Sequence, residues 1–140
     1  MRRMGGQALR MALVSEAYML AGWTDSAEAL ARRGLELSGK SKDKGSRAWL
    51  LRILGDLTAR RSPLKAEQAE ANYAEALGLA RELGMRPLQA HCQLGLGYVH
   101  AQVKDVSKAR SELRAAVELY RAMSMPFWVS KAETALTEVT

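Results

Sequence analysis

Apolar and small residues recur along the chain at the spacing of one face of an α-helix. Three segments share the spacing i, i+4, i+7, i+8, i+11, and they begin at Ala27, Ala69 and Ala109. This spacing places each set on one side of a helix with 3.6 residues per turn. The starting residues are 42 and 40 positions apart. The pattern therefore predicts an internal repeat of about forty residues.

A second helix is expected before each of these segments. A small residue recurs there as Ser15, Gly55 and Gly97, at spacings of 40 and 42. A small side chain lets two paired helices approach closely, whereas a larger one would force their axes apart. Each unit is thus expected to be a helix, a short turn and a second helix.

Seven helices are expected, and no strand pattern competes with them. Their expected ranges are 6–21, 25–38, 46–60, 63–83, 87–102, 106–123 and 126–138. The charged, Gly- and Ser-rich run 38–46 is expected to be a loop, with Gly39 as the left-handed residue that follows a helix. Gly84 is expected to end a later helix in the same way, and Asp105 to cap another. Ser62 is expected to cap the fourth helix, with Pro63 at its first position.

These elements predict one all-α domain over residues 1–140. Its three helix-turn-helix repeats are expected at about 6–40, 45–84 and 87–123, and a capping helix at 126–138. That last segment is apolar on one face and polar on the other, as a helix covering the end of a stack must be. No comparable cover is apparent for residues 1–20.

The repeated pattern resembles the tetratricopeptide repeat (TPR). The matching residues are Leu54-Gly55 and Leu96-Gly97, Tyr18 with Gly22, and the pairs Ala69/Ala76 and Ala109/Ala116. The chain departs from the family pattern at Gly34, Thr58, His100 and Lys104, and its period exceeds the usual 34 residues. The resemblance implies a right-handed α-solenoid that binds proteins.

A closer resemblance covers residues 45–140. The runs 67–73, 80–92 and 119–128 are similar to the C-terminal repeats of large bacterial signalling proteins. Those proteins join an AAA-like ATPase to an adenylate- or guanylate-cyclase domain, a protein kinase or a LuxR-type regulator. The resemblance implies a fragment or a stand-alone relative of such a tail. It implies no cyclase or ATPase activity, because it covers only the tail.

The composition is typical of a globular, cytoplasmic protein. Hydrophobic residues make up 48% of the chain and charged residues 26%. Cys92 is the single cysteine, so no intrachain disulfide is expected. The apolar pattern near the N-terminus is interrupted by Gln7 and Arg10, which argues against a signal peptide. No window approaches the length of a membrane span.

Positive charge is concentrated in the first half of the chain. Residues 1–65 carry 13 basic and 6 acidic side chains, whereas residues 66–140 carry 8 and 9. Such a surface can attract nucleic acid or an acidic partner. The cations that would serve are Arg32, Arg33, Lys40, Lys42, Lys44, Arg47 and Arg61. No recognition-helix motif or cluster of stacking aromatic residues supports nucleic acid, which therefore remains an alternative.

Motifs of catalysis and of metal or cofactor binding occur only in unsuitable contexts. The run 34–41 matches the phosphate-loop pattern, but it continues a helical face instead of following a strand. His91 and His100 are nine residues apart and fall on opposite faces of a helix, and Cys92 adjoins only the first. No nucleophile sits on a sharp elbow beside a base. We therefore expect a binding protein with no catalytic residue, metal or cofactor.

The family resemblance implies where a protein or peptide partner would bind. In TPR domains the first helix of each unit lines a concave groove. The corresponding residues are Ala12, Glu16 and Met19, then Trp49, Arg52, Asp56 and Arg60, and then His91, Leu94, Tyr98 and Gln102. Trp, Tyr and Arg are the residue types most often found as binding anchors. Ala12 and Glu16 stand where a receptor for chaperone tails would carry Lys and Asn, so that class of ligand is not indicated.

Self-association is a further alternative. The first helix has no predicted cover, and it carries Leu9, Leu13, Met4 and Met11. An exposed apolar face of this kind can pair with a second copy of the chain.

Overall fold

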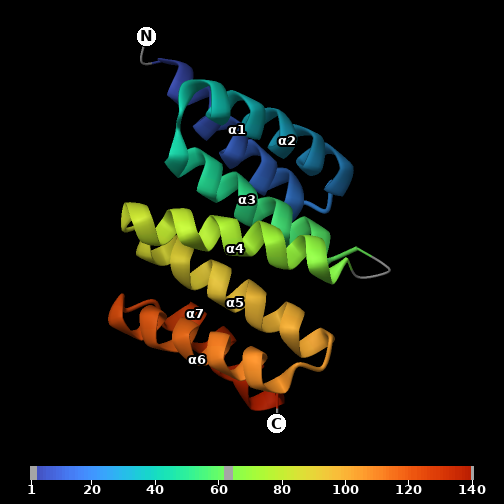
Figure 1. Ribbon diagram of the computed structural model, residues 1–140, viewed down its shortest axis with the longest axis vertical. Coiled ribbons are helices and arrows are strands. Elements are labelled where there is room, and N and C mark those ends of the chain that lie inside the picture. Colours follow the sequence, from blue (N-terminus) through green and yellow to red (C-terminus); the bar gives the residue numbers. More distant parts are fainter. Residues whose placement is uncertain (1–2, 62–64, 140) are drawn as a thin grey trace.

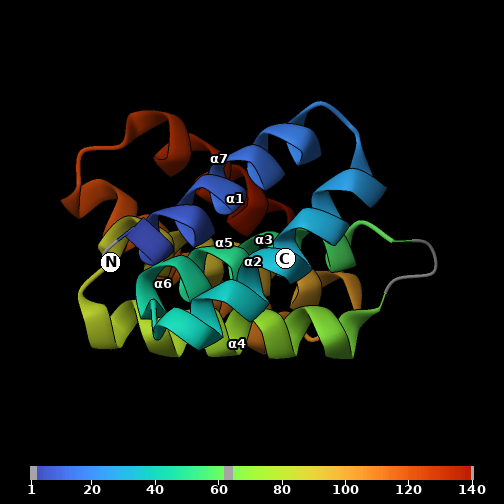
Figure 2. The same cartoon turned by 90° about the horizontal axis from the view of Figure 1, so that it is seen from above.

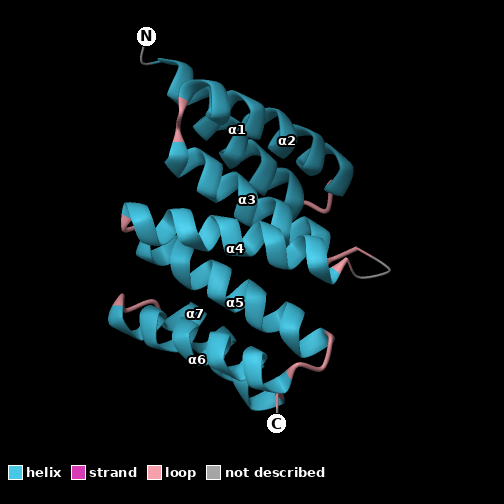
Figure 3. Ribbon diagram, in the orientation of Figure 1, coloured by secondary structure: helices cyan, strands magenta, loops and turns pink. Residues whose placement is uncertain are grey.

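The computed structural model describes the backbone of residues 3–61 and 65–139 and, within those ranges, the side chains from Gly6 onward. This part of the chain is helical throughout apart from short turns, and it contains no strand (Figure 3). The helices are α1 (Arg3–Leu20), α2 (Thr24–Ser41), α3 (Lys44–Ala59), α4 (Ala66–Leu83), α5 (Arg86–Gln102), α6 (Val106–Ala122) and α7 (Pro126–Glu138). The all-α class expected from the sequence is confirmed.

The expected loop at 38–46 is wrong. α2 continues to Ser41 and α3 begins at Lys44, so only Lys42 and Asp43 separate them. The left-handed residue is Lys42, with φ of 58°, and Gly39 lies inside α2. Asp43 makes the early start of α3 favourable, because its side chain accepts hydrogen bonds from the Ser46 amide and hydroxyl. Good capping thus outweighs the composition of the run.

Other helix ends match the expectations more closely. Gly84 ends α4 with a left-handed φ of 71°, and the Asp105 side chain accepts from the Lys108 amide at the start of α6. α4 begins at Ala66, later than the expected position 63. Ser62 and Pro63, which were expected to start it, lie outside the described residues.

Left-handed backbone recurs at the period of the sequence pattern. Lys42, Gly84 and Ser124 follow α2, α4 and α6 with φ of 58°, 71° and 57°, and they are separated by 42 and 40 residues. Gly22 and Lys104 hold φ of 87° and 67° in the turns after α1 and α5. The turns therefore repeat with the helices, even where the residue is not glycine.

Neighbouring helices pack against each other along the whole chain, including every pair from α1·α2 to α6·α7. They follow one another along the long axis of the molecule in Figure 1. From above, α3 and α5 lie between α1 and α7 on one side and α4 on the other (Figure 2). The molecule therefore has an inner side, formed by α1, α3, α5 and α7, and an outer side that includes α4.

Glycines allow one aromatic ring to cross between the helices. Tyr73 of α4 is buried, and its ring lies between Gly55 of α3 and Gly95 of α5. A Cβ at Gly95 would come within 2.4 Å of the ring, and one at Gly55 within 2.8 Å. Gly97 admits Leu113 of α6 in the same manner. The expectation of close approach at Gly55 and Gly97 is confirmed.

Both ends of the stack leave large apolar side chains exposed, and Phe127 of α7 is 64% exposed. α7 buries Ala132 and Ala135 against α6 and exposes polar residues such as Ser130 and Thr134. α1 leaves Leu9 and Leu13 exposed. The side chain of Met4 lies outside the described residues. None of the described helices combines the length and the apolar character needed to cross a membrane.

Candidate functional site

A cleft of about 400 Å³ opens on the inner side of the molecule. We call it the central cleft. Its walls come from α1 (Leu20), from α3 and α5, and from α7 (Trp128 and Lys131), with the Tyr73 ring reaching it from α4. It adjoins a second hollow of about 340 Å³, the Trp49 slot, lined by Glu16, Trp49, Arg52, Met85, Pro87, Leu88 and His91. Arg52 and His91 belong to both hollows, so the two form one continuous surface.

Arg52 holds the floor of this surface together. Its guanidinium bonds Asp56 one turn along α3 at 2.8 Å, and Glu16 of α1 at 3.2 Å. Its side chain is only 12% exposed. Burial alone would lower the pKa of Arg52, but the charges and hydrogen bonds of Asp56 and Glu16 outweigh it and raise the pKa. Arg52 therefore remains a cation that links the first two helix pairs.

Glu16, Arg52 and Asp56 form a triad, and each of its two carboxylates has a second hydrogen-bond partner. The Trp49 indole N–H donates to Glu16 at 2.9 Å. The Tyr73 hydroxyl donates to Asp56 after its ring has passed between the glycines. Burial and the neighbouring Asp56 raise the pKa of Tyr73, so the hydroxyl keeps its proton. The acceptor oxygens on the floor are thus largely occupied, which fixes the Trp49 ring and the Arg52 fork in place.

An aromatic cluster forms the wall nearest the C-terminus. His91 of α5 is hydrogen-bonded through Nδ1 to the Tyr120 hydroxyl at 2.6 Å. Its ring meets the Trp128 ring edge-on, with 4.6 Å between centroids. Burial, followed by the Arg52 charge, lowers the pKa of His91 to about 4. His91 is therefore neutral at physiological pH and acts as a packing and hydrogen-bonding residue.

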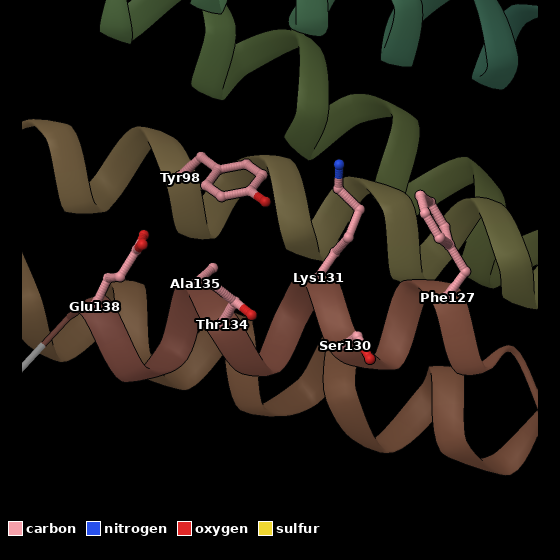
Figure 4. Close-up of a pocket in the computed structure, with 7 residues that line it drawn as sticks. All are labelled: Tyr98, Phe127, Ser130, Lys131, Thr134, Ala135 and Glu138. Atoms are coloured by element: carbon pink, nitrogen blue, oxygen red, sulfur yellow. The ribbon is translucent and has the colours of Figure 1, made fainter.

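A third hollow, of about 270 Å³, continues the surface across α7. Figure 4 shows Phe127, Lys131 and Glu138 extending from α7 toward α5, beside Tyr98. Tyr98 and Lys131 also line the central cleft. The Lys131 ammonium lies 5.5 Å from the Phe127 ring centroid and 5.9 Å from that of Trp128, within the range of cation–π attraction.

The structure brings together most of the residues proposed for the groove. Arg52, Asp56, Arg60, His91, Leu94, Tyr98 and Gln102 line the central cleft, and Glu16 and Trp49 line the adjoining slot. Met19 was placed wrongly, as was Ala12. Both are buried in the core formed by α1, α2 and α3, because they face the neighbouring helices instead of the inner side.

Sequence reasoning missed several residues of this surface, four of them with large side chains in the central cleft. Leu20, Tyr73, Trp128 and Lys131 all line the central cleft. Leu20 lies one helical turn after Glu16, and Lys131 lies one repeat of 40 residues after His91. Continuing the same spacing along α1 and into α7 would therefore have found both residues. No local signal marks Tyr73, because it belongs to an outer helix and reaches the cleft only through Gly55 and Gly95.

The phosphate-loop pattern adopts no loop. All of Gly34–Ser41 lies within α2, and Gly34 faces Leu50, which a Cβ there would approach to 2.9 Å.

Cys92 is fully buried, and burial raises its pKa to about 12. Among the described residues, no three His, Cys, Asp or Glu side chains are grouped so that they could hold a metal ion.

The basic surface of the first half is partly neutralised. Arg32 and Arg61 each pair with Glu28, Lys44 pairs with Glu82, and Arg47 pairs with Glu75. Carboxylates therefore compensate much of the charge that would attract nucleic acid.

Comparison with known proteins adds no relative. No protein-family model matches the chain, and no curated protein matches it significantly.

Proposed function

We propose that the chain is a TPR-like repeat module that binds a segment of a partner protein in its central cleft and Trp49 slot. The role is one of recognition without catalysis. The partner lies across α1, α3, α5 and α7, with its side chains in the two hollows. The chain acts as a scaffold or regulatory module, as the resemblance to signalling proteins implies.

Two observations support the three-repeat reading. The left-handed residues that end α2, α4 and α6 share the 42- and 40-residue spacing of the apolar pattern. In addition, Tyr73 on Gly55 and Leu113 on Gly97 are contacts at equivalent positions of successive units. A periodic backbone with periodic packing is what a solenoid requires, since each repeat packs only on its neighbours.

One observation carries the functional proposal. A continuous inner surface presents Leu20 of α1, Trp49 of α3, Tyr98 of α5 and Arg60 at the end of α3. The half-buried ion pairs on its floor tie α1 to α3. Leu20 is 74% exposed and Tyr98 is 42% exposed, although both are large apolar or aromatic residues. Aromatic and arginine side chains around a preformed hollow are typical of binding hot spots.

A peptide-display selection tests the proposal. A random peptide library is panned on the purified chain, and the affinity of enriched peptides is measured by fluorescence anisotropy. We expect Trp49→Ala with Tyr98→Ala to abolish binding while helicity by circular dichroism is retained. Trp49 also contributes to the triad, so Leu20→Ala with Tyr98→Ala provides a variant that changes only exposed side chains.

Leu83→Ala is the matched control. Leu83 ends α4, on the outer side, and is 42% exposed, the same fraction as Tyr98. Its replacement removes comparable apolar surface and should leave the affinity unchanged. Equal affinities for the wild-type chain and the Leu20→Ala/Tyr98→Ala variant would refute the assignment of the site.

A further inference from the structure

The charges of the central cleft differ in how far they are already paired. Glu16 accepts from both Trp49 and Arg52, and Asp56 accepts from both Arg52 and Tyr73. These carboxylates are therefore poorly able to attract a basic ligand. Any cation that approached them would compete with Arg52, which is already in place.

Two cations of the cleft remain uncommitted. Arg60, which directly follows α3, and Lys131 of α7 both line the cleft, and both are exposed. Within residues 6–61 and 65–139, neither forms an ion pair with a carboxylate. The Lys131 ammonium lies over the Phe127 and Trp128 rings, where it can still pair with an anionic partner. Arg60 and Lys131 come from two different parts of the chain, so a ligand in the cleft meets a cation at the end of α3 and another on α7.

The adjoining Trp49 slot has a different character. Apart from Glu16, Arg52 and His91, it is lined by Trp49, Met85, Pro87 and Leu88. His91 is uncharged there, because burial holds its pKa at about 4. The slot therefore suits a bulky apolar side chain. A ligand that spans both hollows meets apolar side chains in the slot and two unpaired cations in the central cleft.

We propose that the partner segment is an acidic peptide with a bulky apolar anchor. The anchor occupies the Trp49 slot, and Asp or Glu side chains of the same peptide pair with Arg60 and Lys131 in the central cleft. This inference rests on the proposed function and adds the chemistry of the ligand. A polypeptide fits better than a nucleic-acid backbone, because the surface offers two unpaired cations beside an apolar slot, whereas nucleic acid needs a longer row of cations for its phosphates.

Parallel selections test the inference. The same random peptide library is panned on the wild-type chain, on Arg60→Glu/Lys131→Glu, and on Arg114→Glu as a control for reversing an exposed cation outside the cleft. Arg114 is an exposed residue of α6 with no ion pair among the described residues. The peptides are then assayed at low and high salt, since attraction between exposed charges is screened by salt.

We expect the wild-type chain and Arg114→Glu to enrich peptides with several carboxylates and a large apolar residue. These peptides should bind the Arg60→Glu/Lys131→Glu chain about tenfold more weakly than the wild-type chain, because the change replaces two attractions by two repulsions. Enrichment of neutral or basic peptides that still depend on Leu20 and Tyr98 would overturn the inference and leave the proposed function standing. No enrichment on any form of the chain would sink both.

Two further outcomes also count against it. Acidic peptides whose affinity does not change in the Arg60→Glu/Lys131→Glu variant would show that these cations do not select the ligand. A single-stranded oligonucleotide that bound more tightly than any selected peptide, with the same dependence on Arg60 and Lys131, would assign the cleft to nucleic acid.

Discussion

Arg47 and Arg52 lie on the same helix, yet they face opposite sides of the molecule. Arg47 pairs with Glu75 of α4 on the outer side, where its side chain is 36% exposed. Arg52 is 12% exposed and joins two carboxylates on the inner side. Water competes with the first pair and screens it, but it hardly reaches the second. The same chemistry therefore contributes little on the outer face and organises the inner one.

Replacing these two arginines should give the largest difference. Arg52→Met leaves Glu16 and Asp56 half-buried without their cation, and should lower the free energy of unfolding by about 3–5 kcal/mol. Arg47→Met removes an exposed pair and should cost about 0.5 kcal/mol or less. Urea unfolding followed by circular dichroism measures both. Losses that agree within 1 kcal/mol would remove the distinction between the two faces.

Two glycines sharpen the comparison through packing. Gly95→Ala should lower the free energy of unfolding by about 1–3 kcal/mol, because the new methyl group overlaps the Tyr73 ring. Gly78 lies on the exposed side of α4 and has no atom near its Cβ position. Gly78→Ala should raise stability by about 0.5–1 kcal/mol, through helix propensity alone. The two substitutions should change the free energy of unfolding in opposite directions. If Gly95→Ala also stabilised the protein, the Tyr73 ring could not lie against Gly95.

The change that a His91 substitution makes to the pH dependence of stability probes the inner face. Because burial lowers the pKa of folded His91 to about 4, the unfolded chain binds the proton more readily between about pH 6.5 and 4. The contribution of neutral His91 is therefore complete above pH 6.5 and is lost as the pH falls through 4. It amounts to about 2 kcal/mol at most. Urea unfolding from pH 7.5 to 4 should lose less stability in His91→Gln than in the wild-type chain. If the free energy of unfolding falls equally with pH in the two proteins, burial does not lower the pKa of His91.

The turns give the smallest expected effect. Lys42 holds a left-handed φ of 58° at the position that Gly84 occupies in the next unit. Lys42→Gly should relieve this strain and raise the free energy of unfolding by about 0.5–1 kcal/mol, whereas Gly84→Ala should lower it by about 1 kcal/mol. Thermal unfolding of both variants measures the pair. A destabilising Lys42→Gly would mean that the lysine side chain makes a compensating contact.

The all-α class was predictable from the sequence because helical periodicity is a repeated, local signal. Ala27, Ala69 and Ala109 mark the same position three times, and all three are buried. The loop expected at 38–46 is wrong because composition was weighed above the capping ability of Asp43, which lets helices occupy most of that segment. Much of the cleft could be predicted from groove spacing, but Met19 and Tyr73 could not. Their orientation depends on how neighbouring helices pack, which the spacing along one helix does not determine.

The most direct test of the cleft is a map of where a ligand binds. The ¹⁵N-labelled chain is titrated with a display-selected peptide, and amide chemical-shift changes are followed by NMR. The account predicts that the largest changes fall on the inner side, around Asp56, Leu94 and Tyr98, with little change at Arg33 or Glu75. Changes concentrated on the outer helices α2 and α4 would contradict it.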